Sequence, residues 1–208
     1  LILKKIDLKK IHIEFENCKN TEIILEYLSN KKKINKKLIK GCIKILKLSE
    51  KDYKKYSKIL PNYKFLCIDL KNNDFQKIKK TIPSFVFKKH VQFNVILSNN
   101  CFFEIAKIRA FRIWFLKEFN TSPFISCETK TEKLKINSLI QTCSQSFSAI
   151  TGGCDSLKII LDDHILGIKQ QLILMHEGHL DKVVDPFYGS NYIEKVTSFL
   201  NQVKKKIK

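Results

Sequence analysis

The chain has 208 residues, of which 44% are hydrophobic and 11% aromatic, and this composition excludes an intrinsically disordered protein. No stretch approaches about 18 uncharged apolar residues, so we expect no membrane-spanning helix. The formal net charge is +19, yet only two of the 39 basic residues, Arg109 and Arg112, are arginines. Proteins that read nucleic acids favour arginine forks, so the dispersed lysines indicate a solvated basic surface and no specific nucleic-acid partner.

Seven cysteines are scattered along the chain, and none belongs to a CxxC pair. This pattern predicts reduced thiols, a cytoplasmic location and no structural metal site. The residues that follow Leu1 lack the apolar core and the cleavage site of a secretory signal. A first residue other than methionine is what we expect of a piece of a longer protein.

Six strands, each followed by a helix, are expected in chain order. The strands are expected at 10–15, 41–46, 63–70, 91–97, 125–129 and 156–161. The helices are expected at 21–28, 49–59, 73–82, 101–118, 134–150 and 192–207. Repeated βα units predict an α/β fold with a parallel sheet, either open and doubly wound or closed into a barrel. No GxGxxG or GxxxxGK[ST] motif follows a strand, so a nucleotide-binding version is not supported.

The fourth unit has the clearest pattern of apolar residues. Alternation predicts a strand with one buried face, and the helical spacing that follows predicts an amphipathic helix. The residues concerned are Val91, Phe93, Val95 and Leu97 in the strand, and Ile105, Ile108, Trp114 and Phe115 in the helix. The helix at 134–150 is expected to bury the stripe Leu134, Ile140, Cys143, Phe147 and Ile150 and to stop at Gly152 and Gly153.

Several segments, in order, resemble the substrate-binding barrel of the methylmalonyl-CoA mutase family. The strongest match is FFEIAKIRAFRIW at 102–114. The others are IDLKKIHIEFEN at 6–17, INKKLIKGCIKI at 34–45, NYKFLCIDL at 62–70, INSLIQTCSQSFSAITGGCDSLKI at 136–159 and QQLILMHEGHLDKVVDPFYGSNYIEKVT at 170–197. The last segment carries a DP–GS–YxE pattern, which is Asp185, Pro186, Gly189, Ser190, Tyr192 and Glu194.

This resemblance implies an incomplete or degenerate (β/α) TIM-type barrel. Residues 1–208 would form a single domain with about the last six βα units of that barrel, and no cobalamin-binding domain is expected in the chain. Within it, Ser190 is expected to cap the final helix, and Glu194 is expected near that helix's positive end.

Two departures distinguish the chain from the active subunits that it resembles. The family's Tyr-His pair after the fifth strand is missing from IDLKNNDFQK at 68–77. The His-x-Gln loop on the seventh strand is missing from ISCETKT at 125–131. In both segments the chain resembles the family's small, non-catalytic subunit. We therefore expect no catalytic, cofactor-binding or metal-binding residue in this chain.

The function implied by the resemblance is therefore structural. The chain would form a heterodimer with a large subunit that binds adenosylcobalamin and interconverts succinyl-CoA and (R)-methylmalonyl-CoA. Three alternatives are an acyl-CoA isomerase active in its own right, a basic nucleic-acid-binding protein and a decayed fragment without function.

Two histidine motifs invite a ligand role. DDHILG at 162–167 matches DxHxxG, which supplies a histidine ligand to cobalt in this same family. We interpret it instead as the loop after the last strand, because too few residues follow it for the domain that the ligand needs. HEGH at 176–179 is not HExxH, so its histidines are expected on the surface or at a helix cap. His12 and His90 are also expected to be exposed.

Other polar residues are expected to have structural roles. Arg109 and Arg112 should anchor their helix or a subunit contact. Glu128 and Glu132 lack a neighbour that would tune an acid pair. Ser138, Ser144, Ser146 and Ser148 lie on a helix without a nucleophile elbow.

Overall fold

The computed structural model describes residues 12–15, 40–43, 53–54, 57–58, 63–64, 66–70, 78, 81–82, 84, 90–130, 135–180 and 182–206. The chain divides into two compact units. The first is 1–68 with 82–92, and the second is 69–81 with 93–208. The helix expected at 21–28 lies outside the described residues, and so does most of the two helices expected at 49–59 and 73–82.

The first unit contains a parallel three-stranded sheet. Its strands are β1 (His12–Phe15), β2 (Lys40–Ile43) and β3 (Tyr63–Lys64), in that order. The same unit buries His90, which is 2% exposed and whose Nδ1 lies 2.8 Å from the Tyr53 hydroxyl. The prediction that His90 is exposed was therefore wrong, because its partner comes from 37 residues away in the sequence.

A four-stranded parallel sheet follows the order of the chain. It consists of β4 (Leu66–Asp69), β5 (Val91–Ile96), β6 (Phe124–Glu128) and β7 (Ser156–Lys158). The α/β class with parallel strands is confirmed. The single strand expected at 63–70 was wrong, because it divides into β3 and β4, which belong to different sheets.

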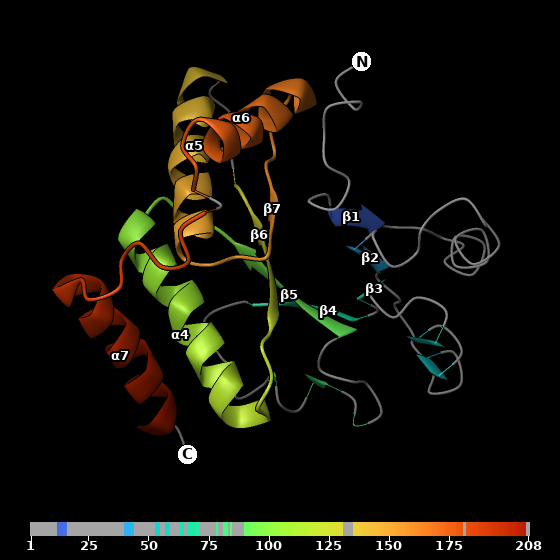
Figure 1. Ribbon diagram of the computed structural model, residues 1–208, viewed down its shortest axis with the longest axis vertical. Helices are drawn as coiled ribbons and strands as arrows, with labels where there is room; N and C mark the ends of the chain where they lie inside the picture. Colours follow the sequence, from blue (N-terminus) through green and yellow to red (C-terminus); the bar gives the residue numbers. More distant parts are fainter. Residues whose placement is uncertain are drawn as a thin grey trace. The chain divides into compact units, whose positions relative to one another are not determined.

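Among the described residues, four helices accompany this sheet: α4 (Cys101–Phe119), α5 (Lys135–Thr151), α6 (His164–His176) and α7 (Asn191–Lys206). Figure 1 shows α4 and α5 on the same side of β5, β6 and β7, with α7 outside α4. A sequential strand order with the helices on one face is how the wall of a β/α barrel is built. Closure into a barrel, and a single domain over 1–208, stay predictions.

The ends of helix α4 have clear chemical causes. The Asn100 side chain accepts a hydrogen bond from the Phe103 amide, 3.2 Å away, and so caps the start. Asn120 ends the helix in the left-handed conformation at φ 50°, and its amide donates to the Leu116 carbonyl. The predicted turn between the strand at 91–97 and the helix at 101–118 is confirmed.

The core of the second unit lies around α4. Phe93 of β5 packs edge-on against Phe111 and Phe115, with ring centroids 5.0 Å away in both cases. On the opposite side of the helix, Ile105, Ala106 and Ala110 pack against Ile193 and Leu200 of α7. The predicted buried face of the strand, Val91, Phe93, Val95 and Leu97, is confirmed.

Helix α6 was not predicted. In its sequence, HILGIKQQLILMH, polar and apolar residues are mixed around the helix, so it lacks the two-faced periodicity that reveals a surface helix. None of the helices within the described ranges is long and apolar enough to cross a membrane.

Replacing Phe93 by alanine is expected to lower the free energy of unfolding by about 3–5 kcal/mol, because it leaves a cavity between α4 and the sheet. Urea denaturation at neutral pH measures the effect. The matched control is Phe199→Ala on α7, where the ring is exposed and the expected change is within about 0.5 kcal/mol. Equal effects of the two substitutions would contradict this core assignment.

Candidate functional site

Arg109 joins helix α4 to the DP–GS–YxE segment. Its Nη2 donates to Asp185 Oδ2 at 3.0 Å and to Glu194 Oε1 at 2.7 Å. The guanidinium is almost fully buried, whereas both carboxylates are partly exposed. Arg109 was expected to anchor its helix or a subunit contact, and these bonds within the chain give it the first of those roles. Its two partners lie 76 and 85 residues away.

The same contacts organise the segment itself. Asp185 Oδ1 accepts from the Phe187 amide at 3.2 Å, and Glu194 Oε1 accepts from the Gly189 amide at 3.4 Å. Ser190 lies at the N-cap position of α7, where its carbonyl accepts from the Glu194 amide. The hydrogen bond from Arg109 lowers the pKa of Glu194, although partial burial acts in the opposite direction.

Arg112 anchors the residues just before the amino-terminal ends of β6 and β7. Its Nη2 donates to the Gly153 carbonyl at 2.6 Å and to Asp155 Oδ2 at 2.7 Å, and its Nη1 donates to Ser122 Oγ at 2.8 Å. Asp155 Oδ2 also accepts from the Ile125 amide at 2.9 Å. This one side chain therefore holds the segments that lead into β6 and β7. A lysine at position 112 would keep the positive charge, but it lacks the planar guanidinium whose two terminal nitrogens donate to several acceptors at once.

Uncharged amide side chains gather at the carboxyl-terminal ends of the strands, which we call the carboxyl edge of the sheet. Asn99 Oδ1 accepts from Gln141 Nε2 at 2.6 Å and from Gln145 Nε2 at 2.9 Å. Gln145 also bonds both backbone groups of Lys130, at 2.9 and 3.1 Å. Amides bind by hydrogen bonding but do not transfer protons near neutral pH. An open hollow of about 360 Å³ lies here, lined by Asn99, Asn137, Ile140, Gln141 and Ser144.

Glu104 lies at the same edge and was not singled out by its sequence. It is fully buried in the first turn of α4, where its Oε1 accepts from Ser98 Oγ at 2.7 Å and its other oxygen pairs with Lys107. Buried carboxylates need such partners and gain from a helix N-terminus. Its position in the first turn was the available signal, and its role is to fix the turn from β5 into α4.

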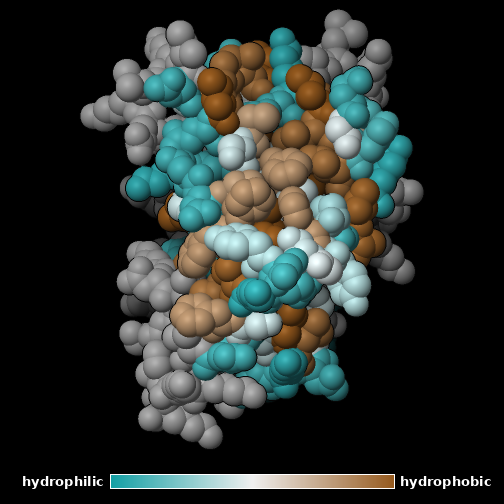
Figure 2. All heavy atoms as spheres, turned by 90° about the vertical axis from the view of Figure 1, so that its left-hand side faces the viewer, coloured by the Kyte–Doolittle hydropathy of each residue, from teal (hydrophilic) through white to brown (hydrophobic). Residues whose placement is uncertain are grey.

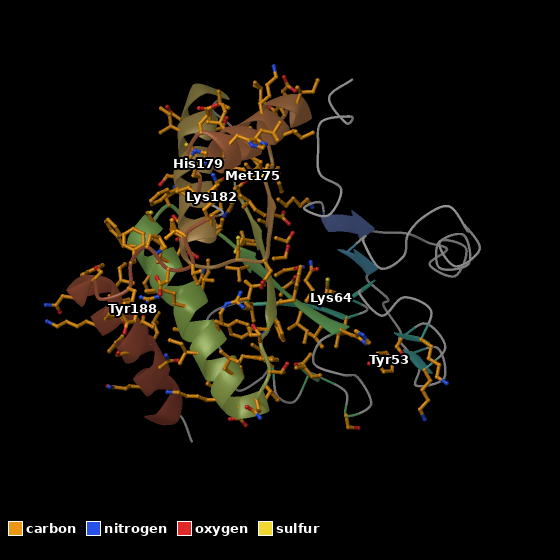
Figure 3. The ribbon with its side chains drawn as sticks, viewed as in Figure 1. Tyr53, Lys64, Met175, His179, Lys182 and Tyr188 are labelled. Atoms are coloured by element: carbon orange, nitrogen blue, oxygen red, sulfur yellow. The ribbon has the colours of Figure 1, made fainter. Side chains whose placement is uncertain are left out.

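The two histidine motifs form the ends of α6. Asp163 caps the start of this helix, with its Oδ1 accepting from the Ile165 amide at 2.8 Å. The loop expected at 162–167 is thus shorter than predicted, because His164 begins the helix. His176 is the last residue of α6, and exposed His179 lies just beyond it at φ 49° (Figure 3). The expected surface or cap location of HEGH is confirmed.

The remaining candidates also have structural contacts. Glu128 pairs with Lys158 at 3.7 Å, and Glu132 lies outside the described residues, as does the side chain of His12. Ser148 Oγ donates to the Ser144 carbonyl at 2.8 Å, a common way of satisfying a serine within a helix. Within the part of the chain that the structure describes, no cluster of three or more His, Cys, Asp or Glu side chains could hold a metal ion.

The apolar stripe predicted for α5 was wrong. Ile140 and Cys143 are exposed, whereas Thr142, Gln145 and Ser146 are buried. Two of these buried polar groups have partners, because Thr142 bonds to Gln170 at 3.1 Å and Gln145 bonds as described above, whereas the Ser146 hydroxyl is buried without a hydrogen bond. The side chain of Leu134 lies outside the described residues.

Comparison with known proteins gives one consistent family. The family model described as Methylmalonyl-CoA mutase matches residues 76–208. The chain is 31% identical over 137 residues to a methylmalonyl-CoA mutase of Rhizobium meliloti, a match that covers 55% of this chain and 19% of that protein. It is 29% identical over 137 residues to a methylmalonyl-CoA mutase small subunit of Porphyromonas gingivalis, covering 54% of this chain and 22% of that protein. The chain thus spans about a fifth of the length of these relatives.

Replacing Arg109 by methionine is expected to return the pKa of Glu194 toward its ordinary value and to lower the free energy of unfolding by about 1–2 kcal/mol. This is less than for fully buried ion pairs, because the carboxylates are partly exposed. Carboxyl NMR titration reads the pKa directly. Lys195→Met, which removes an exposed lysine of the same helix start, is the control.

The pH dependence follows from the direction of this shift. A lowered carboxyl pKa contributes stability that is fully present above the unfolded-state pKa, near 4.3, and is lost as the pH falls through the folded-state pKa. The stability difference between wild type and Arg109→Met should therefore be constant near neutral pH and shrink below about pH 4. A stability difference that grows on acidification would contradict an ion pair between Arg109 and Glu194.

Gly152 and Gly167 give a second matched pair. A Cβ on Gly152 would lie 2.9 Å from the Ser148 carbonyl oxygen and 3.1 Å from Ile108 Cδ1, so Gly152→Ala should lower stability by about 1–3 kcal/mol. A Cβ on Gly167 meets ordinary contacts at 3.5 Å, so Gly167→Ala within α6 should be neutral or stabilising by up to about 1 kcal/mol. Chemical denaturation distinguishes them, and a harmless Gly152→Ala would refute close packing of α4 and α5.

Proposed function

The chain belongs to the methylmalonyl-CoA mutase family, and from that membership we propose that it is the small, non-catalytic subunit of an adenosylcobalamin-dependent methylmalonyl-CoA mutase. The large subunit would interconvert succinyl-CoA and (R)-methylmalonyl-CoA, and this chain would stabilise it through an extensive interface. The likeness to a named small subunit supports this assignment. Free thiols at five described cysteines support the cytoplasmic location that the proposal includes.

The observation that carries the proposal is the chemistry of the carboxyl edge. Enzymes built on β/α barrels place their reacting groups at this edge. Here the amides of Asn99, Gln141 and Gln145 bond to one another and to the Lys130 backbone, and buried Glu104 is engaged by Ser98 and Lys107. Groups that hold turns together in this way favour a supporting role over proton or radical chemistry.

The segment 162–167, which matches the cobalt-ligand pattern, does not fit a cobalamin ligand site. In the DxHxxG match, His164 is the first residue of α6, and Asp163, the residue between the pattern's Asp162 and His164, caps that helix. We therefore derive no step of the reaction through this chain. In the proposal, adenosylcobalamin is bound by the large subunit, where it supplies the radical.

Co-expression with the large subunit of a methylmalonyl-CoA mutase from the same organism tests this function. The expected result is a stable one-to-one complex that converts methylmalonyl-CoA when adenosylcobalamin is added, with no turnover by the small chain alone. Turnover by the isolated chain would support an independent acyl-CoA isomerase instead. Failure to form a complex, with salt-sensitive DNA binding tighter than about micromolar, would favour a nucleic-acid-binding protein.

A further inference from the structure

Helix α7 packs on the second unit mainly through helix α4. Its inner side meets a short apolar surface of α4, which is formed by Ile105, Ala106 and Ala110. Its outer side is exposed, including the aromatic rings of Tyr192 and Phe199. Figure 2 views the molecule from the side on which α7 lies, and hydrophilic residues lie among hydrophobic ones there. A helix with one main neighbour can separate while the sheet and the other helices stay folded.

The contact between α7 and α4 buries polar atoms that have no partner. Thr197 is 2% exposed, and its Oγ1 lies one helical turn from Asn201 Oδ1 on the inner side of α7. Both oxygens are buried without a hydrogen bond, and so is Arg109 Nη1 on the α4 side. Such atoms regain hydrogen bonds to water when a contact opens. These three atoms therefore weaken the docking of α7 on α4.

The start of α7 combines an ionic contact with a glycine. Arg109 Nη2 donates to Asp185 Oδ2 at 3.0 Å and to Glu194 Oε1 at 2.7 Å. Gly189 lies between the two carboxylates in the sequence, at φ 81°, and a Cβ at this position would meet nothing within 4 Å. A glycine in open space can change its backbone angles without a clash, as a hinge residue must.

The position of this glycine lowers the cost of breaking the ionic contact. Glu194 lies after Gly189 and would leave together with α7, and it is already partly exposed to water. Asp185 lies before Gly189 and would stay beside α4, so the Arg109 guanidinium keeps one carboxylate partner. Movement about Gly189 therefore leaves no buried charge unpaired, which is the step that would otherwise oppose it most.

We propose that α7 is a hinged strap, which turns about Gly189 and undocks from α4 as one unit while the rest of the second unit stays folded. The open form uncovers the apolar surface of α4 and hydrates Thr197 and Asn201. Opening needs no other molecule, so the strap is independent of the function proposed above.

Native-state hydrogen exchange on the full chain, read residue by residue by NMR, tests this motion. Amides at 195–203 should share one opening free energy and exchange about tenfold or more faster than amides at 105–115 of α4. A helix that only frays would show exchange that slows steadily away from its carboxyl end. That gradient would contradict the strap.

Two double variants test the unpaired oxygens. Thr197→Val combined with Asn201→Leu removes both of them and should slow exchange in α7 by about tenfold or more. The matched control is Ser198→Val combined with Gln202→Leu, which makes the same kind of change on the exposed side of α7 and should keep the rate within about threefold. Exchange that the first variant leaves unchanged or makes faster would overturn the proposal.

Phe93→Leu distinguishes opening of α7 from unfolding of the whole second unit. Phe93 packs between the sheet and α4, so the smaller side chain should speed exchange of the α4 amides by about tenfold. Amides at 195–203 should keep their wild-type rate, because the strap opens without disturbing that core. Equal acceleration in both helices would mean that α7 opens only on global unfolding, and the proposal would be wrong.

Discussion

Two guanidinium groups on one helix hold the second unit of this protein together. Arg109 and Arg112 lie three residues apart on α4, yet they act on separate parts of the fold. Arg109 secures the turn before α7, and Arg112 secures the segments that lead into β6 and β7. A chain so rich in lysine has arginine only at these two positions, where a flat donor must serve two or more acceptors at once.

The position of the outer surface follows from these contacts. The bond between Arg109 and Asp185 orders the turn that carries Phe187 and Tyr188, and that turn places aromatic rings beside α4 and α5. Meanwhile Gln145 rotates α5 so that its polar side faces inward. Polar networks inside the fold thus determine which apolar residues remain outside. The same networks occupy the carboxyl edge of the sheet, where enzymes built on β/α barrels place their reacting groups.

The sequence predicted the elements well where local periodicity and burial agree. The β5–α4 unit was expected almost to the residue, since alternation in 91–97 and helical spacing after Asn100 both describe the actual core. The resemblance to a known family also identified the DP–GS–YxE segment before its contacts with Arg109 were known.

Two of three errors share one cause, which is a distant polar partner that overrides the local pattern, and the third has a local cause. The apolar stripe of α5 was placed inside because its sequence does not show that Asn99 and Lys130 would satisfy Gln145. His90 was placed outside because Tyr53 lies far along the chain. Helix α6 was missed because its polar and apolar residues are mixed around the helix, which leaves no helical period in the sequence.

Hydrogen exchange with and without the mutase large subunit measures the central claim most directly, that this chain lends a surface to a catalytic partner. Association should slow exchange in peptides from the surface that the large subunit covers, while peptides elsewhere exchange as before. Unchanged exchange throughout the chain, or protection at 98–100 and 128–130 when methylmalonyl-CoA is added to the chain alone, would contradict it.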